Sequence, residues 1–287
     1  GKIRNKGVEI NLHSVNIKNN DFSWTSDFAF SLNRNKVVSI LGDDNDGDGR
    51  EDDLPSSGYF IGKPLGAVYA YKVIGMWQQS DVDNGTIMEG MRPGDYKLED
   101  VNGDGTIDSE HDRQILGNTN PNFRWSLTNT LGYKDFSLML YFNSVWGGNG
   151  YYLSENNTPY KDGYANAPNI NHPVYDYWTP ENQNASSPRL IWTDPNRNAR
   201  SESDRYLESG SYFRLRNLQV GYTLPTVWFH GFVQKARVYV NAENLFTISS
   251  YSGYTPDVNS SDVYSRGFDE FIYPSNRTFM FGLNVTF

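Results

Sequence analysis

The sequence predicts an all-β fold, namely part of a large antiparallel β-barrel that crosses a membrane with strands. Apolar and polar residues alternate with period two in its clearest segments, as they do in strands with one apolar and one polar face. Aromatic residues make up 15% of the 287 residues, and no segment keeps a helical period. The expected connections are short and long in turn, which is typical of a barrel with turns on one rim and loops on the other.

The last eleven residues, 277–287, show the alternation best. One face carries Phe279, Phe281, Leu283, Val285 and Phe287. The other face carries Thr278, Met280, Gly282, Asn284 and Thr286. A wall between lipid and a wet interior needs such a strand. The last strand of a soluble β-sandwich alternates in the same way, so this segment alone does not choose between the two folds.

Six further segments show the same alternation and are predicted to be strands. They are residues 8–12, 22–32, 123–133, 136–142, 213–224 and 238–242. In the fifth of them the apolar positions change phase between Leu215 and Leu218. This change predicts a β-bulge near Arg216 and Asn217, because one extra residue moves all later side chains to the opposite face.

The connections support a membrane barrel over a sandwich. Tight turns are expected at 19–21 and 134–135, and a modest one at 225–235. Long outer loops are expected at 33–122, 143–211 and 247–276. This order places Phe287 on the short-turn rim. Seven strands are an odd number, whereas bacterial single-chain barrels have an even number. Residues 1–287 are therefore expected to be one segment of a larger barrel.

Composition excludes several classes of function. The net charge of −9 disfavours nucleic acid, and without cysteine there is neither a disulfide framework nor a thiolate metal site. The four histidines, at positions 13, 111, 172 and 230, show neither zinc spacing nor a partnered nucleophile. We therefore expect no enzymatic activity.

One acidic loop has the ligand pattern of a calcium site. Calcium prefers several hard oxygen ligands, which a loop supplies from alternate positions around a glycine turn. The candidate ligands are Asp100, Asn102, Asp104, the main-chain carbonyl of Thr106, Asp108 and Asp112. His111 occupies the twelfth position, so Asp112 reaches the ion only if the loop bulges by one residue. The alternative is a solvated turn with no fixed ion.

A second acidic stretch repeats this spacing loosely. Asp44, Asp46, Asp48 and Asp52 are candidates for a second cation loop. Its twelfth position is Pro55, which supplies no carboxylate. Crowded carboxylates without a cation repel one another and stay hydrated, so a solvated loop is the favoured interpretation.

Aromatic residues gather in the expected loop 143–211 and near strand ends. Trp146, Tyr151, Tyr152, Trp178 and Trp192 are candidate ligand contacts, because aromatic faces stack on sugar rings and on peptide side chains. Packing within the loop is the alternative for most of them. Trp125, Tyr133, Tyr141, Tyr222 and Trp228 are instead predicted to form girdles at the membrane interface.

Several blocks, in order along the whole chain, resemble one family. They are Asn-Lys-Gly-Val-Glu-Ile at 5–10, the segments 94–108 and 116–121, Gly-Ser-Tyr-Phe-Arg-Leu-Arg-Asn-Leu at 210–218, Asn-Ala-Glu-Asn-Leu-Phe at 241–246, Tyr-Ser-Gly-Tyr-Thr-Pro-Asp at 251–257 and the aromatic last strand. Together they resemble the C-terminal portion of SusC-like TonB-dependent transporters of the Bacteroidetes outer membrane. The plug, the TonB box and the early strands of such a protein lie outside this chain.

This resemblance implies a plugged barrel of the 22-stranded class. It also implies import of oligosaccharides or peptides across the outer membrane, with a SusD-like surface lipoprotein as lid and the TonB complex as energy source. The loop aromatics would contact substrate or lid, and Phe287 would be the signal that the barrel-assembly machinery reads. The alternatives are a soluble, calcium-stabilised, carbohydrate-binding β-sandwich and a passive porin or adhesin barrel.

Overall fold

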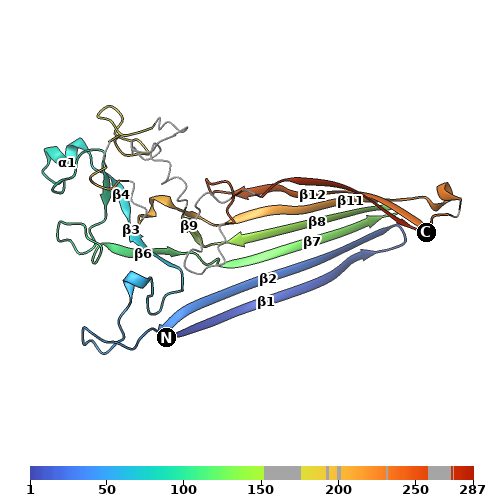
Figure 1. Cartoon of the computed structure of the whole chain (residues 1–287), viewed down its shortest axis with the longest axis horizontal. Coiled ribbons are helices and arrows are strands. Elements are labelled where there is room, and N and C mark those ends of the chain that lie inside the picture. Colours follow the sequence, from blue (N-terminus) through green and yellow to red (C-terminus); the bar gives the residue numbers. More distant parts are fainter. Residues whose placement is uncertain (152–175, 192–193, 199–201, 231, 258–272, 274) are drawn as a thin grey trace.

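A single antiparallel sheet organises the protein (Figure 1). The computed structural model describes residues 1–151, 176–191, 194–198, 202–230, 232–257, 273 and 275–287. The sheet contains β1 (Lys2–Lys18), β2 (Phe22–Ser39), β7 (Phe123–Tyr133), β8 (Phe136–Trp146), β11 (Tyr212–Leu224), β12 (Lys235–Ser249) and β13 (Thr278–Thr286). Its strand order follows the chain, so all seven predicted strands are confirmed, each next to its neighbours in sequence.

Some predicted loop boundaries are wrong because several strands are longer than expected. The loops predicted at 33, 143 and 247 begin after Ser39, Trp146 and Ser249 respectively. Residues 33–36 are polar, yet they pair with β1 in regular register. A strand with water on both faces needs no apolar row, so alternation could not reveal these extensions.

Short turns lie at one end of the sheet and long loops at the other, as predicted (Figure 1). In the first turn the Asn19 side-chain oxygen accepts N–H bonds from Asp21 (3.1 Å) and Phe22 (2.7 Å), which fixes a tight Asx turn. The second turn has Lys134 at φ +51°, and the third contains the 3-10 helix η4 (Thr226–Phe229). The C-terminus lies at this end, so the predicted placement of Phe287 is confirmed.

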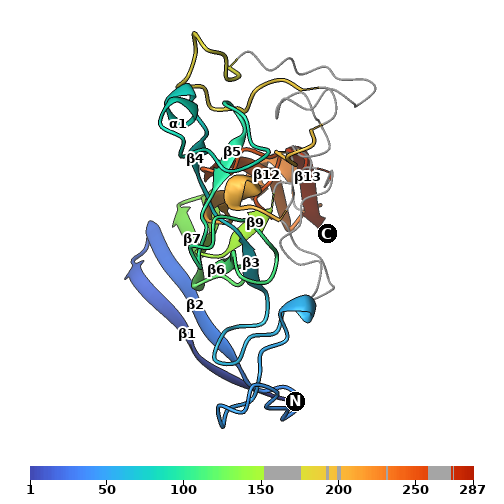
Figure 2. The same ribbon diagram turned by 90° about the vertical axis from the view of Figure 1, so that its left-hand side faces the viewer.

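The loops form their own layer, seen end-on in Figure 2. It contains η1 (Pro55–Ser57), β3 (Ala67–Tyr71), β4 (Val73–Met76), α1 (Gln79–Asp83), β5 (Tyr96–Leu98), β6 (Arg113–Asn118), β9 (Asn149–Tyr151), η3 (Asp204–Tyr206) and β10 (Leu207–Ser209). Two-stranded pairs join β3 to β6, β4 to β5 and β9 to β10. Val68 and Ala70 of β3 form a small buried core with Tyr206 of η3. No helix of the described residues is long and apolar enough to cross a membrane.

The upper part of β2 leaves its neighbour in the sheet. Its pairing with β7 ends at Ser31, while its pairing with β1 continues to Ser39. Beyond Ser31 a loop segment covers the open side of β2. The Val37 N–H donates to the Lys63 carbonyl, and the Gly62 N–H donates to the Val37 carbonyl, both at 2.9 Å.

Strand register sorts the side chains into two faces, since directly paired residues of antiparallel strands point the same way. The apolar face includes Val8, Ile10, Leu12, Phe28, Phe30, Trp125, Leu127, Leu138, Leu140, Leu218, Val220, Val238, Val240, Phe279, Phe281 and Leu283. The register shifts between Leu215 and Asn217, and this shift returns Leu218 to the apolar face. The predicted β-bulge is confirmed.

Much of the apolar face is exposed, with Phe281 81% and Leu283 61% accessible. Aromatic rows mark its two ends. Tyr133, Phe136 and Tyr222 lie near the short turns, and Phe123 stacks on Trp146 near the loops (6.2 Å between ring centroids). Phe123 and Tyr133 are the two ends of β7. Their separation is about 33 Å along the strand, or about 25 Å along the axis of a barrel with strands tilted by about 40°. Outer-membrane barrels have an apolar band of about this height.

Two aromatic predictions are corrected by this register. Trp146 lies on the apolar face beside Phe123, so it is part of an aromatic row rather than a ligand contact. Tyr141 was predicted to be a girdle residue, but it pairs with Thr128 and Asn217 on the polar face. The alternation of Phe136, Leu138, Leu140 and Phe142 already places Tyr141 on the opposite face, whereas Trp146 lies beyond the predicted end of that strand.

Candidate functional site

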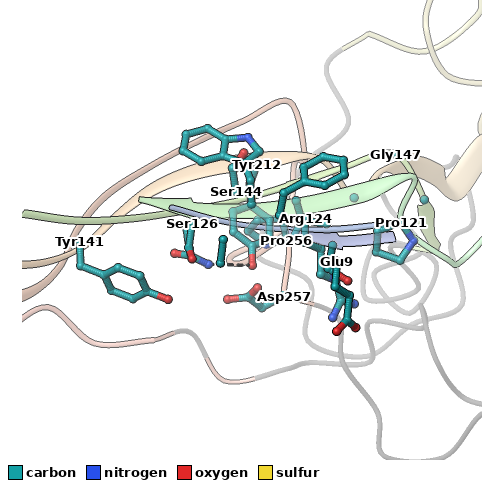
Figure 3. A pocket seen from close by; sticks show the side chains of 18 of the residues that line it. Glu9, Pro121, Arg124, Ser126, Tyr141, Ser144, Gly147, Tyr212, Pro256 and Asp257 are labelled. Carbon is teal, nitrogen blue, oxygen red and sulfur yellow. Dashed lines mark hydrogen bonds between the residues drawn. The ribbon is translucent and has the colours of Figure 1, made fainter. Parts of the chain in front are cut away.

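The polar face carries a cavity of about 430 Å³ near the loop end of the sheet (Figure 3). Adjacent strands supply its wall, because residues two apart on each strand project to the same side. The wall includes Glu9, Asn11, Ser31, Arg124, Ser126, Tyr141, Asn143 and Tyr212. Residues Tyr251, Pro256 and Asp257 border it from the connection after β12. The cavity therefore lies between the sheet and a loop.

We call residues 250–257 the strap, and one buried arginine attaches it to the sheet. Arg214, 3% exposed on β11, forms an ion pair with Asp257. Its Nε also donates to Thr247 Oγ1 at 2.8 Å, and its guanidinium lies 4.9 Å from the centre of the Tyr212 ring. Tyr251 of the strap is itself buried. This arrangement fixes the border of the cavity.

Replacing Asp257 by asparagine is expected to loosen the strap. The amide keeps a hydrogen-bond acceptor but leaves the Arg214 charge without its partner, and breaking a buried pair costs about 3–5 kcal/mol. The side chain of Asp257 is 25% exposed, so we expect the low end of this range. Amide hydrogen exchange of residues 250–257 should become faster in the full-length protein, and exchange in β8 should not. Asp21→Asn, in a short turn, is the control. Unchanged strap exchange would contradict the assigned role.

Two charged side chains of the wall have no partner among the described residues. The side chains of Glu9 and Arg124 have no hydrogen bond or ion pair within the described residues, and Ser31 lies between the two residues in register. Two strand spacings separate them, which is about 10 Å. The Asn143 side-chain oxygen is buried and has no donor, although its Nδ2 donates to the Tyr212 hydroxyl at 3.3 Å. The wall thus offers a negative charge, a positive charge and an acceptor.

Of these wall residues, only Tyr141 was singled out from the sequence, and there as a girdle residue. The wall comes from five strands, β1, β2, β7, β8 and β11, whose side chains meet through register. The sequence signal that could have found the wall is the row of polar residues that alternates with each apolar row. On the first strand, for example, Glu9 and Asn11 alternate with Val8, Ile10 and Leu12.

The loop 100–112 has the predicted oxygen-rich geometry. Asp100 accepts N–H bonds from Gly103 (2.7 Å) and Gly105 (2.8 Å). The fully buried Asp112 accepts from Val101 (2.8 Å) and Asp108 (2.7 Å), so it joins the two ends of the loop. Each of its oxygens thus accepts one backbone hydrogen bond, and its role as a metal ligand stays a prediction.

Hydrogen bonds lower the pKa of two carboxylates of this loop, Asp104 and Asp108, which favours the charged form that a divalent cation requires. A hydrogen bond from His111 (3.0 Å) lowers the pKa of Asp108 to about 2. The Thr106 hydroxyl and N–H lower the pKa of Asp104. Beside Asp108 the pKa of His111 is raised.

The second acidic stretch brings its carboxylates closer together. Asp44, Asp46 and Asp48 place ligand oxygens within 4.8 Å of one another, which no other group of three acidic, histidine or cysteine side chains does in the described part of the chain. Asp52 does not join them, since it accepts bonds from the backbone (2.8 Å) and side chain (2.7 Å) of Asn45. All three clustered aspartates are exposed.

Trp178 has a packing role in the structure. It is 7% exposed, and its Nε1 donates to the Gln78 side chain at 2.9 Å. Its ring lies against Gly94, where a Cβ atom would come within 2.6 Å and where φ is +86°. This burial corrects its prediction as a ligand contact. Tyr151 lies in β9, but its side chain is outside the described residues, as are Tyr152 and Trp192.

A buried aspartate joins two loops that are distant in sequence. Asp95 is inaccessible to solvent and accepts bonds from Arg189 Nε (2.7 Å), Asn196 Nδ2 (2.6 Å), Asn198 Nδ2 (3.0 Å) and the Arg92 N–H (2.9 Å). The loop after β2 is thereby attached to the loop after β8. Sequence reasoning missed this centre, because its partners lie about a hundred positions away.

Known proteins resemble the chain over its whole length. It is 34% identical to TonB-dependent receptor P3 of Formosa agariphila and 26% identical to TonB-dependent receptor SusC of Bacteroides thetaiotaomicron, in each case over 100% of the chain. The RagAB peptide transporter has a similar fold, with a TM-score of 0.75 at 22% identity over 99% of the chain. No family model matches.

The chain spans less than a third of each relative. It covers 29% of receptor P3, 27% of SusC and 29% of the RagAB transporter chain. The short sequence blocks that resemble the family lie within an alignment to receptor P3 that covers all 287 residues of the chain.

Proposed function

Because this chain is related along its whole length to part of SusC-like TonB-dependent receptors, we propose that it forms barrel wall in an outer-membrane importer. The observation that carries the proposal is the pair of sheet faces. The apolar face crosses all seven strands without a change of side, while charged and amide groups line the other face. A wall between hydrocarbon and a wet interior needs this arrangement.

We further propose oligosaccharides or peptides as substrates, a SusD-like lipoprotein as lid, and energy from the TonB complex through parts of the protein outside this chain. The polar wall supports this, since Glu9, Arg124 and Asn143 can exchange hydrogen bonds with either class of polar polymer. Transport requires such reversible contacts and no bond chemistry, so the proposed role is not enzymatic.

The two alternatives are less well supported. In a soluble sandwich a second layer would cover the apolar face, but its side chains on β13 are largely exposed among the described residues. A passive porin would conduct without TonB. Loss of uptake when TonB is deleted, with the protein still in the outer membrane, supports the importer. Uptake that persists without TonB would support the porin.

Residues 1–287 expressed alone are expected not to form a soluble monomer. In the described structure β1 and β13 each have a partner strand on one side only. Unpaired backbone groups in hydrocarbon cost several kcal/mol each, so the segment needs further strands to close. Size-exclusion chromatography and thermal melting without detergent test this. A monomer that melts cooperatively would contradict the barrel assignment, whereas the full-length protein in detergent is the positive control.

We also propose that the loop 100–112 binds calcium as a structural ion. The loop supplies hard oxygens from Asp100, Asn102, Asp104, Thr106 and Asp108, and the low pKa of Asp108 favours its charged form.

In the full-length protein, we expect Asp104→Ala to abolish the calcium-dependent part of loop protection against protease. Asp135→Ala, in a short turn, is the control. If the native loop is protected from protease equally well in calcium and in chelator, as the Asp104→Ala loop is expected to be, the loop binds no calcium. The same measurement on Asp46→Ala tests the second acidic stretch.

A further inference from the structure

Basic residues continue the apolar face of β1 and β2 where these strands extend past the loop ends of β7 and β8 (Figure 1). Val8 and Leu32 are a directly paired couple on this face. The register is regular over this stretch, so the next pairs at two-residue steps toward the loops point to the same side. These pairs are Lys6 with Arg34 and Arg4 with Lys36. We call these four residues the basic patch.

The basic patch lies just beyond the aromatic row at the loop end. Phe123 belongs to that row, and Trp125, two residues further along β7, pairs with Phe30 of β2. Phe123 is therefore level with Leu32, and the two basic pairs lie two and four residues beyond this level. At the strand rise and tilt used above, these separations are about 5 Å and about 10 Å along the membrane normal. The headgroup layer is about 5–8 Å thick, so the patch lies in it and at its outer border.

Charge on this face is confined to the β1–β2 hairpin. The paired positions of β7, β8, β11, β12 and β13 on the same face carry no charged residue. Their positions nearest the loops are aromatic or aliphatic, namely Phe123, Trp146, Phe213 and Ile248. The four cations therefore form a local feature of the outward face rather than a general property of its rim.

Nothing in the described part of the chain neutralises the basic patch. No carboxylate there forms an ion pair with it, including those of the second acidic stretch. Like charges directly opposite one another on paired strands are unfavourable, and here this arrangement occurs twice in succession. Arg34 donates through Nη1 alone, to the carbonyls of Asn33 (3.1 Å) and Asn122 (2.5 Å). Its other nitrogens are left to bind an anion.

We propose that the basic patch binds the phosphate groups of lipid headgroups in the outer leaflet of the membrane. Long loops mark the outer side of an outer-membrane barrel, so the patch faces that leaflet. A phosphate accepts charge-assisted hydrogen bonds from guanidinium and ammonium groups, and it relieves the repulsion between the paired cations. Val8, 53% exposed directly below the patch, would contact an acyl chain of the same lipid. The proposal rests on the membrane placement given above and adds a lipid ligand to it.

Binding of lipid A, the phosphorylated anchor of lipopolysaccharide, to the full-length protein in detergent tests this site. A non-phosphorylated lipid A analogue is the matched ligand, and inorganic phosphate is the free-ion competitor. The double variant Lys6→Gln/Arg34→Gln removes one basic pair. Each basic residue near an anionic membrane surface changes binding about fivefold, so affinity for lipid A should fall about 25-fold. Lys18→Gln/Lys235→Gln, which removes two charges near the short turns, is the control and should bind as the native protein does.

A charge-preserving exchange separates the role of charge from damage to the hairpin. Lys6→Arg/Arg34→Lys should bind lipid A nearly as tightly as the native protein. Three outcomes would overturn the proposal: equal native affinity for lipid A and its non-phosphorylated analogue, unchanged affinity of the double glutamine variant, or displacement of lipid A by an equal concentration of inorganic phosphate. A protein missing from the outer membrane would instead overturn the membrane placement, which fractionation reports separately.

Discussion

Replacing Asp95 by alanine is expected to separate the two loops that this residue joins, without unfolding the sheet. The substitution leaves Arg189, 18% exposed at its side chain, and two asparagine amides without their common acceptor. Breaking a buried ion pair from one side costs about 3–5 kcal/mol. Local opening of residues 176–191 and 194–198 should therefore become about a hundredfold or more populated.

Limited proteolysis and amide exchange of the full-length protein check this result. Cleavage within 176–191 and 194–198 should accelerate strongly, whereas the melting temperature of the barrel should move little, because the described residues that donate to the Asp95 carboxylate all lie in loops. Asp83→Ala, at the end of the exposed helix α1, is the matched control. Equal cleavage rates for the native protein and Asp95→Ala would show that other contacts attach these loops.

Deleting Phe287 is expected to lower the amount of protein in the outer membrane far more than the stability of what is inserted. The residue follows β13 and is 81% exposed. Complete burial of a phenylalanine contributes only about 1.5–3 kcal/mol, so a side chain this exposed contributes much less to the folded barrel. If the assembly machinery reads this terminus, as the family resemblance implies, the loss falls on insertion.

Quantitative immunoblots of outer membranes and melting of the purified protein separate the two effects. Phe287→Tyr, which keeps an aromatic terminus, should insert at the native level. Equal membrane levels for the native protein and the deletion would leave Phe287 as an ordinary interface residue.

The strands could be predicted from the sequence because their signal is local. The apolar row of residues 277–287 and the phase change after Leu215 each follow from the pleat of a single strand. The upper half of β2 could not be predicted in this way, because both of its faces are polar where Asn33, Arg34 and Lys36 pair with β1. No pattern within one segment distinguishes such a strand from a loop.

The site was less predictable because its residues meet through register and through loops. Trp146 has the composition of a ligand contact, but pairing with Phe123 turns it to the apolar face. Arg214 resembles any strand residue until Asp257, 43 positions later, is seen beside it. Asp95 likewise cannot be recognised from its own segment, because its side-chain partners lie about a hundred residues away. Long-range electrostatic contacts leave no periodic trace in a sequence.

The segment that covers the upper part of β2 closes an edge to which another strand could otherwise pair. A strand with a bare edge is a template on which foreign strands can add, which leads to aggregation or to capture of extended peptides. Here Gly62 and Lys63 occupy the hydrogen-bonding groups of Val37 on that edge. An extended peptide would therefore find this side of the β1–β2 hairpin already paired.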